Sequence, residues 1–360
     1  MDPSRPELLV GTGRRRLLPS DSPASAAPSD PAWFVAFLKT HRPEQMLNAR
    51  WQGLRSRAGA PPLRVLMDEA SRRASPLAQQ AQFDLLRSLI AEERLGFGDH
   101  LDFVPVVLTS IGLLGYEVGA DSPLMRDMAL QLDRQIELTL EALHKAPGDG
   151  KFGLAFTAAH GSPPEPDPSS RPLFAMKGDD VARAVNGALS ALYDVSTVKN
   201  RYVERYVYPF LYLRHEQLRR YGIEAREARR AAGEAALRVP GVAAYYTADG
   251  ACSRGGEWVE RFRGSFHAVR SGDLMLAYQP NLVEEAGAGR GVSYGSLYGY
   301  DTRVPLIFYG EPFRAQTLEG AVETVDIAPT LARAMRVAPP SSSVGHVLAQ
   351  AFAARAASRK

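Results

Sequence analysis

LDFVPVVLT, residues 101–109, is an apolar run of strand length, and FGLAFT, residues 152–157, is another. Between them lies DSPLMRDMALQLDRQIELTLEAL, residues 121–143. This segment opens with a helix cap followed by proline at the first helical position, and its apolar side chains at Met125, Met128, Leu132, Ile136 and Leu140 fall on one helix face. Because strand, helix and strand follow one another, a sheet with parallel strands and right-handed crossovers is expected.

Further apolar segments continue this pattern along the chain. Their periodicity predicts helices and strands on both sides of the central segments. The expected helices cover residues 33–38, 77–95, 324–335 and 344–352, and the expected strands cover residues 242–246, 273–278 and 304–309. The fold class is therefore α/β, with a largely parallel central sheet flanked by helices.

Composition shifts suggest where the ordered domain begins and where it is interrupted. Residues 1–31 are rich in Pro, Ser, Ala and Arg without sustained periodicity, so they are expected to form a disordered leader. Residues 32–355 then form one domain. A cap-like insertion is expected at about residues 162–250, because a Pro/Ser-rich loop at 162–180 precedes a group of further helices.

Bulk properties exclude several classes of protein. The chain has 360 residues and 45% hydrophobic content, enough for a substantial core, and a net charge of +3 is too small to indicate a nucleic-acid partner. Cys252 is the single cysteine, so neither an intrachain disulfide nor a cysteine-based zinc cluster is expected. The sequence shows no signal peptide and no membrane span, which predicts a cytoplasmic location as written.

Five stretches occur in an order that resembles one known family. They are LTSIGLLGYEVGADSPLMRDMALQLDRQI at 108–136, LAFTAAHGS at 154–162, FHAVRSGDLMLAYQP at 266–280, GVSYGSLYGYDTRVPLIFYG at 291–310 and VDIAPTLA at 325–332. Together they resemble the alkaline phosphatase superfamily, in the branch of the phosphate-irrepressible alkaline phosphatases and the type I phosphodiesterases/nucleotide pyrophosphatases. The similarity runs from about residue 33 to residue 352, and it implies an alkaline-phosphatase-like α/β fold.

The resemblance also implies where metal ligands should lie. In that family, Asp and His side chains hold two zinc ions that stabilise the attacking and leaving oxygens of a phosphate ester. The matching positions here carry Gly112, Tyr116, Ala159 and Tyr294, and only His160 is a retained ligand. Zinc needs three or four good donors, so the site is expected to be degenerate, with no bound cofactor, although active family members bind zinc.

The family's nucleophile and phosphate-contacting residues precede the region of similarity. The resemblance therefore implies a truncated, C-terminal part of the family fold, with no catalytic residue of its own. The expected function is that of a catalytically impaired relative of metal-dependent phosphomonoesterases and phosphodiesterases, which is either a binding or scaffold protein or a fragment of a split or damaged gene. Active relatives are commonly periplasmic or secreted, in contrast to the cytoplasmic location read from this sequence.

Other residues of the quoted stretches are interpreted as structural. His267 belongs to a family pattern in which Arg270, Ser271, Gly272 and Asp273 shape the turn into the next strand. Asp301 and Arg303 flank a framework segment. Asp326 precedes Ile327-Ala328-Pro329 and is expected to cap a helix.

Two other functions stay open at this point. One is an active phosphate-ester hydrolase whose site is completed by a companion chain carrying the N-terminal half of the fold. The other is a carbohydrate or small-molecule binding module that uses a concentration of tyrosines at positions 193, 202, 206, 208 and 212.

Overall fold

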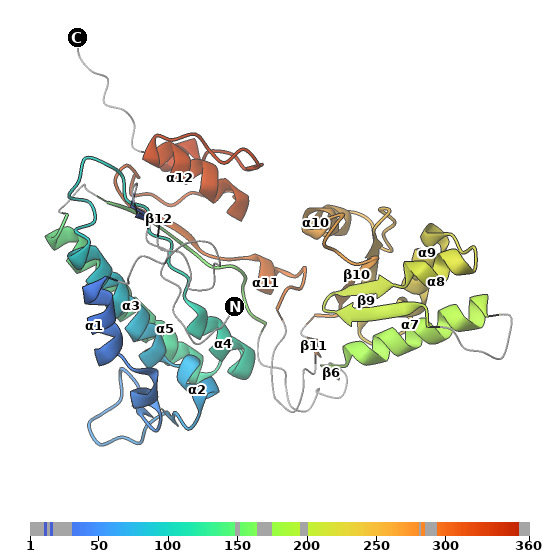
Figure 1. Cartoon of the computed structure of the whole chain (residues 1–360), viewed down its shortest axis with the longest axis horizontal. Helices are drawn as coiled ribbons and strands as arrows, with labels where there is room; N and C mark the ends of the chain where they lie inside the picture. The colour runs from blue at the N-terminus through green and yellow to red at the C-terminus, as the bar shows by residue number, and fades with distance from the viewer. Residues whose placement is uncertain are drawn as a thin grey trace, which may run out of the picture. The chain divides into compact units, whose positions relative to one another are not determined.

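The computed structural model of the chain divides into two compact units (Figure 1). It describes residues 11–12, 15–16, 31–147, 152–163, 175–194, 201–280, 282–284 and 294–352. The first unit takes in residues 1–113, 127–158 and 305–360, and the second takes in residues 114–126 and 159–304. Most of the predicted leader, residues 1–31, lies outside the described residues. The predicted insertion at about 162–250 falls inside the second unit, and its function as a cap stays a prediction.

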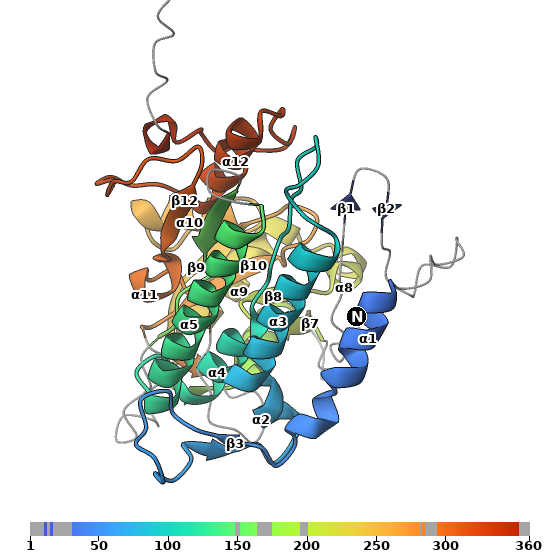
Figure 2. The same cartoon turned by 90° about the vertical axis from the view of Figure 1, so that its left-hand side faces the viewer.

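Three helices of the first unit pack side by side (Figure 2). They are α1 (Ala32–Thr40), α3 (Pro76–Glu92) and α5 (Pro123–Lys145), joined by the short α2 (Glu69–Arg73). Leu89 and Ile90 of α3 are buried against Trp33 and Leu143. Local sequence sets the helix starts, because the hydroxyls of Ser75 and Ser122 accept hydrogen bonds from the main chain three residues later. The predicted helices at 33–38, 77–95 and 123–143 are confirmed.

A buried tryptophan anchors the short antiparallel pair β3 (Arg50–Trp51) and β4 (Arg64–Val65) to α5. Trp51 is fully buried, and its indole Nε1 donates to Asp127 Oδ2 at 2.7 Å. The other carboxylate oxygen of Asp127 accepts from Leu54 N at 2.7 Å. Each polar group that this packing removes from water thus has a partner, as a buried indole and carboxylate require.

The sheet of the first unit differs from the prediction. β5 (Gly153–Thr157) and β12 (Leu306–Gly310) confirm the strands predicted near 152–157 and 304–309, but they pair antiparallel. The predicted strand at 101–109 is wrong: residues 101–108 form neither helix nor strand, and α4 (Thr109–Val118) starts at Thr109. A strand needs a neighbour for its main-chain donors and acceptors, and the described residues supply none beside 101–108.

The end of the first unit is less helical than expected. A 3-10 turn at Thr324–Asp326 leads into α12 (Ile327–Met335), which confirms the helix predicted at 324–335. The helix predicted at 344–352 is wrong, since only a single 3-10 turn at Ala349–Ala351 forms there. Asp326 occupies the cap position of α12 without capping it. Its carboxylate instead accepts from the main-chain nitrogens of His346 and Glu323, which hold the pKa of Asp326 below its ordinary value.

The second unit is built on a four-stranded antiparallel sheet in the order β7-β8-β10-β9 (Figure 1). The strands are β7 (Val203–Val207), β8 (Phe210–Leu213), β9 (Val242–Thr247) and β10 (Leu274–Tyr278), and the last two confirm the strands predicted at 242–246 and 273–278. β6 (Ala175–Met176) and β11 (Val283–Glu284) form a separate parallel pair. The predicted α/β class is correct, but the strands of both principal sheets run antiparallel.

Helices cover both faces of this four-stranded sheet. Alternate residues of β10 point to opposite sides, as a strand's period of two requires. Leu274 and Leu276 pack in the cluster that contains residues of α7 (Gly178–Tyr193) and α9 (Ala225–Leu237). Met275 and Ala277 pack in a second cluster, with Phe262 of α10 (Glu257–Ser265). Both faces of β10 are therefore buried.

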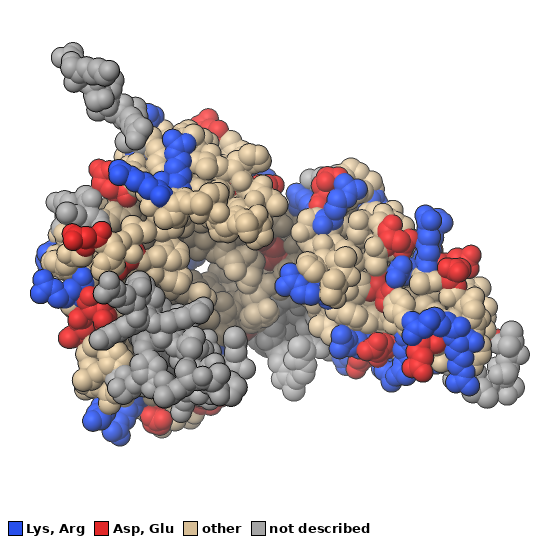
Figure 3. Space-filling view, turned by 45° about the horizontal axis from the view of Figure 1, so that its top comes forward, with Lys and Arg blue, Asp and Glu red and all other residues tan. Residues whose placement is uncertain are grey.

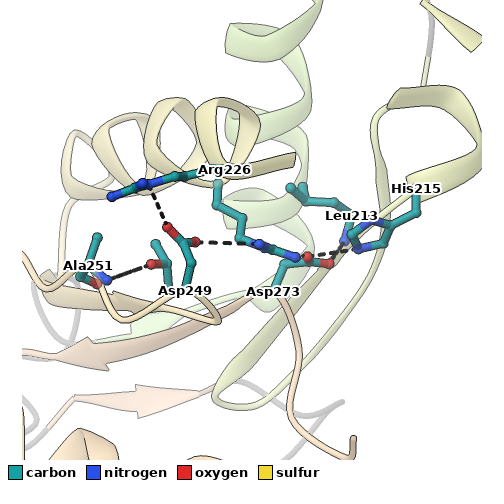
Figure 4. Close-up of polar contacts among 8 residues, drawn as sticks. Leu213, His215, Arg226, Asp249, Ala251 and Asp273 are labelled. Carbon is teal, nitrogen blue, oxygen red and sulfur yellow. Dashed lines mark hydrogen bonds and ion pairs between the residues drawn. The ribbon is translucent and has the colours of Figure 1, made fainter. Parts of the chain in front are cut away.

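One carboxylate ties the loops at the end of this sheet together (Figure 4). Asp273, 7% exposed, accepts from Leu213 N at 2.8 Å and from Arg229 Nε at 2.9 Å, and His215 Nε2 lies 2.8 Å from Asp273 Oδ1. Arg229 also lies 3.5 Å from Asp249, which pairs with Arg226 at 3.3 Å. Asp273 thus connects β8 and β10 to α8 (His215–Arg220) and α9.

The turn that precedes β10 has the structural function predicted for residues 270–273. The main-chain nitrogens of Arg270 and Ser271 donate to His267 O, and the Ser271 hydroxyl accepts from His267 N. A Cβ at Gly272 would lie 2.6 Å from Leu211 O, so only glycine allows this close approach of the two strands.

None of the described helices combines the length and the apolar character needed to cross a bilayer. The cytoplasmic location inferred from the sequence stays a prediction.

Substitution of Asp273 by Ala should destabilise the second unit. The change leaves Leu213 N without its acceptor and removes a buried partner of Arg229, so the free energy of unfolding should fall by about 2–4 kcal/mol. Urea denaturation followed by circular dichroism measures the effect. Glu260→Ala breaks an exposed pair with Arg263 and should change stability by less than about 0.5 kcal/mol. If both substitutions lowered the free energy of unfolding equally, the contacts of Asp273 with Leu213 and Arg229 would not stabilise the second unit as argued.

Candidate functional site

Three of the sequence-predicted site residues meet in the second unit. Tyr116 lies on α4, His160 follows β5, and Tyr294 precedes α11 (Gly299–Thr302). The ring centroids of Tyr116 and Tyr294 are 3.9 Å apart, and those of His160 and Tyr294 are 4.2 Å apart. These three residues therefore lie together in the fold, although they are separated by up to 178 positions in the sequence.

The two remaining positions contribute no side chain to this cluster. Gly112 lies on α4 one turn before Tyr116, and no heavy atom lies within 4 Å of where its Cβ would stand. Gly112 belongs to the first unit, so its place relative to the cluster is not described. Ala159 directly precedes His160 and is exposed. Neither residue carries a group that could bind a metal ion.

Tyr294 is enclosed by residues of its own unit. It is 7% exposed, and its ring contacts those of both Tyr116 and His160. The Tyr294 hydroxyl reaches Gly115 so closely that any Cβ there would overlap it, and Met125 Cε also lies near that position. Gly115 thus makes room on α4 for the phenol.

Desolvation raises the pKa of both phenols of the cluster, although Tyr116 is 49% exposed. Desolvation raises the pKa of Tyr294 far above its ordinary value, and the nearby Tyr116 and Asp301 raise it further. Desolvation and Asp301 also raise the pKa of Tyr116. Because the phenolate form is disfavoured, neither tyrosine offers a good anionic oxygen ligand near neutral pH.

His160 is held by the main chain that follows it. Its Nδ1 lies 2.8 Å from Gly161 O, so Nδ1 carries the proton and Nε2 is the acceptor of the neutral ring. Gly161 N donates to Asp301 O at 2.7 Å. A Cβ at Gly161 would overlap the carbonyl of Tyr300, which explains why glycine follows the histidine.

Asp301 is a member of the site that sequence reasoning interpreted as purely structural. It is 3% exposed; its Oδ2 accepts from Ser296 N at 2.8 Å, while its Oδ1 has no hydrogen-bond partner among the described residues. Burial raises the pKa of Asp301, an effect opposed by the Ser296 hydrogen bond and by His160. The sequence signal that could have identified Asp301 is its position, as an acidic residue, inside the aromatic stretch SYGSLYGYD at 293–301.

These residues do not fit a two-zinc centre. Zinc sites use three or four N, O or S donors, and a pair of zinc ions needs more. The cluster offers one imidazole nitrogen and one buried carboxylate, and the other two ring positions are neutral phenols. Within the described ranges, no three His, Cys, Asp or Glu side chains are placed to hold a metal ion together.

Comparison with known proteins gives the class to which this fold belongs. No protein-family model matches the chain. The chain is 29% identical over 296 residues to alkaline phosphatase PhoD of Zymomonas mobilis, covering 77% of this chain and 50% of that protein. It is 25% identical over 292 residues to a protein of Myroides odoratus named calcium-transporting ATPase, covering 78% of this chain and 52% of that protein.

The fold is also similar to that of a solved structure. The crystal structure of wild-type alkaline phosphatase PafA matches 90% of this chain with a TM-score of 0.76 and 19% identity. In sequence and in fold the chain is similar to proteins of the alkaline phosphatase superfamily, as its resemblance to that family predicted. It spans about half the length of the curated relatives that it matches, and it covers 66% of the PafA chain.

The two glycines of α4 allow a matched test of the cluster. Gly115→Ala places a methyl group against the Tyr294 hydroxyl and should lower the free energy of unfolding by about 1–3 kcal/mol. Gly112→Ala meets open space and should raise it by about 0.5–1 kcal/mol, because alanine is the better helix residue. Thermal and urea unfolding of both variants measure the difference. A neutral Gly115→Ala would show that Tyr294 does not occupy this position.

Alkaline pH should weaken the folded state through Tyr294. Its pKa is raised in the folded chain, so its contribution is fully present below the unfolded value of about 10 and is lost as the pH rises above it. Tyr294→Phe keeps the ring but has no proton to lose, so its unfolding free energy should fall less steeply above pH 10. Urea unfolding from about pH 8 to 11 compares the two chains, and parallel profiles would contradict this assignment.

Proposed function

We propose that this chain is a catalytically impaired member of the alkaline phosphatase superfamily, retained as a binding or scaffold protein rather than as a phosphate-ester hydrolase. The observation that supports this most is the position of Tyr294. A phenol occupies this position in place of an imidazole ligand, and its buried ring contacts both Tyr116 and His160.

The chemistry of the remaining donors supports the same proposal. Two-metal hydrolysis needs cations that activate the attacking oxygen and stabilise the leaving one. His160 can accept one proton or bind one cation through Nε2, and Asp301 is buried with its pKa raised. One imidazole beside neutral phenols supplies neither the charge nor the ligand number for that reaction.

The packing does not favour the tyrosine-rich binding module. Tyr202 is fully buried, and its hydroxyl donates to Asp194 at 2.8 Å. The hydroxyls of Tyr206 and Tyr278 are 2.7 Å apart, and Tyr208 stacks on Tyr278. These rings pack against the four-stranded sheet instead of forming an open platform.

The surface charge does not favour nucleic acid as a partner of this chain. On the described part of the face in Figure 3, blue and red side chains are interspersed and no extended field of one sign forms. Non-specific binding of nucleic acid depends on neutralising several phosphates with clustered Lys and Arg. The net charge of +3 gives little support for such binding.

Activity and metal content test the proposal together. The chain, purified from a phosphatase-deficient host with zinc in all buffers, should hold less than about 0.1 zinc per chain, because the site lacks the three or four donors that zinc requires. It should hydrolyse a chromogenic phosphate monoester and diester no faster than a matched blank. Ala159→Asp combined with Tyr294→His should not restore turnover, because Gly112 and Tyr116 still lack metal-binding groups.

A parallel preparation of Zymomonas mobilis PhoD serves as the positive control for the assay. Turnover that follows the chain through two columns and disappears in His160→Ala would overturn the proposal. That result would instead favour an active hydrolase whose site is completed by residues that the sequence motifs do not reveal.

A further inference from the structure

Asp301 places a carboxylate inside the second unit without a cation beside it. Its side chain is 3% exposed, Ser296 N donates to Oδ2, and Oδ1 has no hydrogen-bond partner among the described residues. No Lys or Arg of the described chain forms an ion pair with it. Arg303, two residues along the chain, is exposed, and its Nε lies 3.7 Å from where a Cβ of Gly299 would stand. A buried carboxylate is costly unless a positive group compensates it, so this part of the unit favours a cationic ligand.

Three aromatic rings lie within the electrostatic reach of this carboxylate. Tyr116 is 49% exposed and its ring contacts that of Tyr294 at 3.9 Å between centroids, while the exposed His160 ring contacts Tyr294 at 4.2 Å. Besides desolvation, Asp301 raises the pKa of both phenols. The face of a tyrosine ring attracts cations. Exposed rings and a buried negative charge therefore favour the same kind of ligand.

The wall of aromatic side chains continues along the segment that ends at Asp301. The rings of Tyr298 and Tyr300 stack at 5.7 Å, and Trp258 meets Tyr298 edge to face, also at 5.7 Å. All these rings belong to the second unit. Methyl and methylene groups of a ligand would thus meet an apolar, ring-lined surface beside the carboxylate.

The donor set selects among cations. A metal ion would find fewer than three His, Cys, Asp or Glu donors within the described ranges. A primary ammonium carries N–H groups that need acceptors when they leave water, and the orphaned Oδ1 of Asp301 is enclosed by the protein. A quaternary ammonium has no N–H group, so it can leave water for a ring face without losing a hydrogen bond. An anionic ligand would be repelled by Asp301.

We propose that the second unit binds quaternary ammonium groups at the ammonium site, formed by Tyr116, His160, Tyr294 and Asp301. The methyl groups of the ligand pack on the exposed rings of Tyr116 and His160, and Asp301 supplies the compensating negative charge. This inference rests on the proposed function as a binding protein and names the class of ligand.

The test titrates the full chain with choline chloride by isothermal calorimetry at neutral pH and constant ionic strength. Binding should saturate at one choline per chain, and tetramethylammonium chloride should bind similarly. Ammonium chloride carries the same charge without the methyl groups, so it should bind about tenfold more weakly or not measurably.

Two variants separate the contributions of charge and ring. Asp301→Asn keeps an oxygen acceptor for Ser296 N but removes the charge, and it should weaken choline binding about tenfold. Tyr116→Leu removes an exposed ring and should weaken it by about fivefold. Glu260→Gln is the matched control, because it removes an exposed carboxylate of the same unit that pairs with Arg263, and it should leave binding within about twofold. Circular dichroism verifies that each variant folds, and Tyr116→Leu decides if Asp301→Asn does not.

Three results would overturn the inference: no saturable heat with choline, equal affinities for choline and ammonium, or choline binding that folded Asp301→Asn and Tyr116→Leu leave unchanged. Failure of the proposed function has a different readout. A chain that hydrolyses phosphate esters through His160 would overturn that proposal whatever its affinity for choline, whereas a chain without zinc, turnover or choline binding would overturn the ammonium site alone.

Discussion

The hydrogen-bonding requirement of a β-strand governs how this chain folds. Main-chain donors and acceptors must be paired when they leave water, and the second unit meets this need with four adjacent strands whose inner members are buried. In the first unit the described strands form only two-stranded pairs, such as β5 with β12, and residues 101–108 have the apolar sequence of a strand without a described ladder. The difference between the two sheets therefore follows from the number of available neighbours, because both contain comparably apolar strands.

The availability of contact partners also explains how the segments of the candidate site are held together. A metal centre joins distant strand ends through ligands, and its binding free energy contributes to folding. Here the segments around His160 and Tyr294 are joined by ring contacts and by main-chain bonds to Asp301, from Gly161 N to its carbonyl and from Ser296 N to its carboxylate. Packing and hydrogen bonds thus connect the segments without requiring a cation.

Sequence reasoning succeeded where structure is determined within a segment. The helices α3 and α5 and the strands β9 and β10 follow from periodicity and caps, which are local properties. Sequence reasoning failed for residues 101–109 because a strand also depends on a distant neighbour. It predicted parallel instead of antiparallel pairing for β5 and β12, because an apolar run does not show in which direction its neighbour runs. Convergence of Tyr116, His160 and Tyr294 was predictable from the family pattern, whereas the orphaned Oδ1 of Asp301 depends on tertiary burial.

The packing around Tyr294 also opposes its replacement by histidine. Replacing the ring by a smaller imidazole would leave unfilled space beside Gly115 and remove part of the contact with Tyr116; loss of buried volume of this kind costs about 1–3 kcal/mol. The returning imidazole would find only one other histidine in the cluster, so metal binding could not offset that loss. A histidine at position 294 alone is therefore disfavoured unless metal-binding groups at positions 112, 116 and 159 accompany it and their metal binding offsets the lost packing.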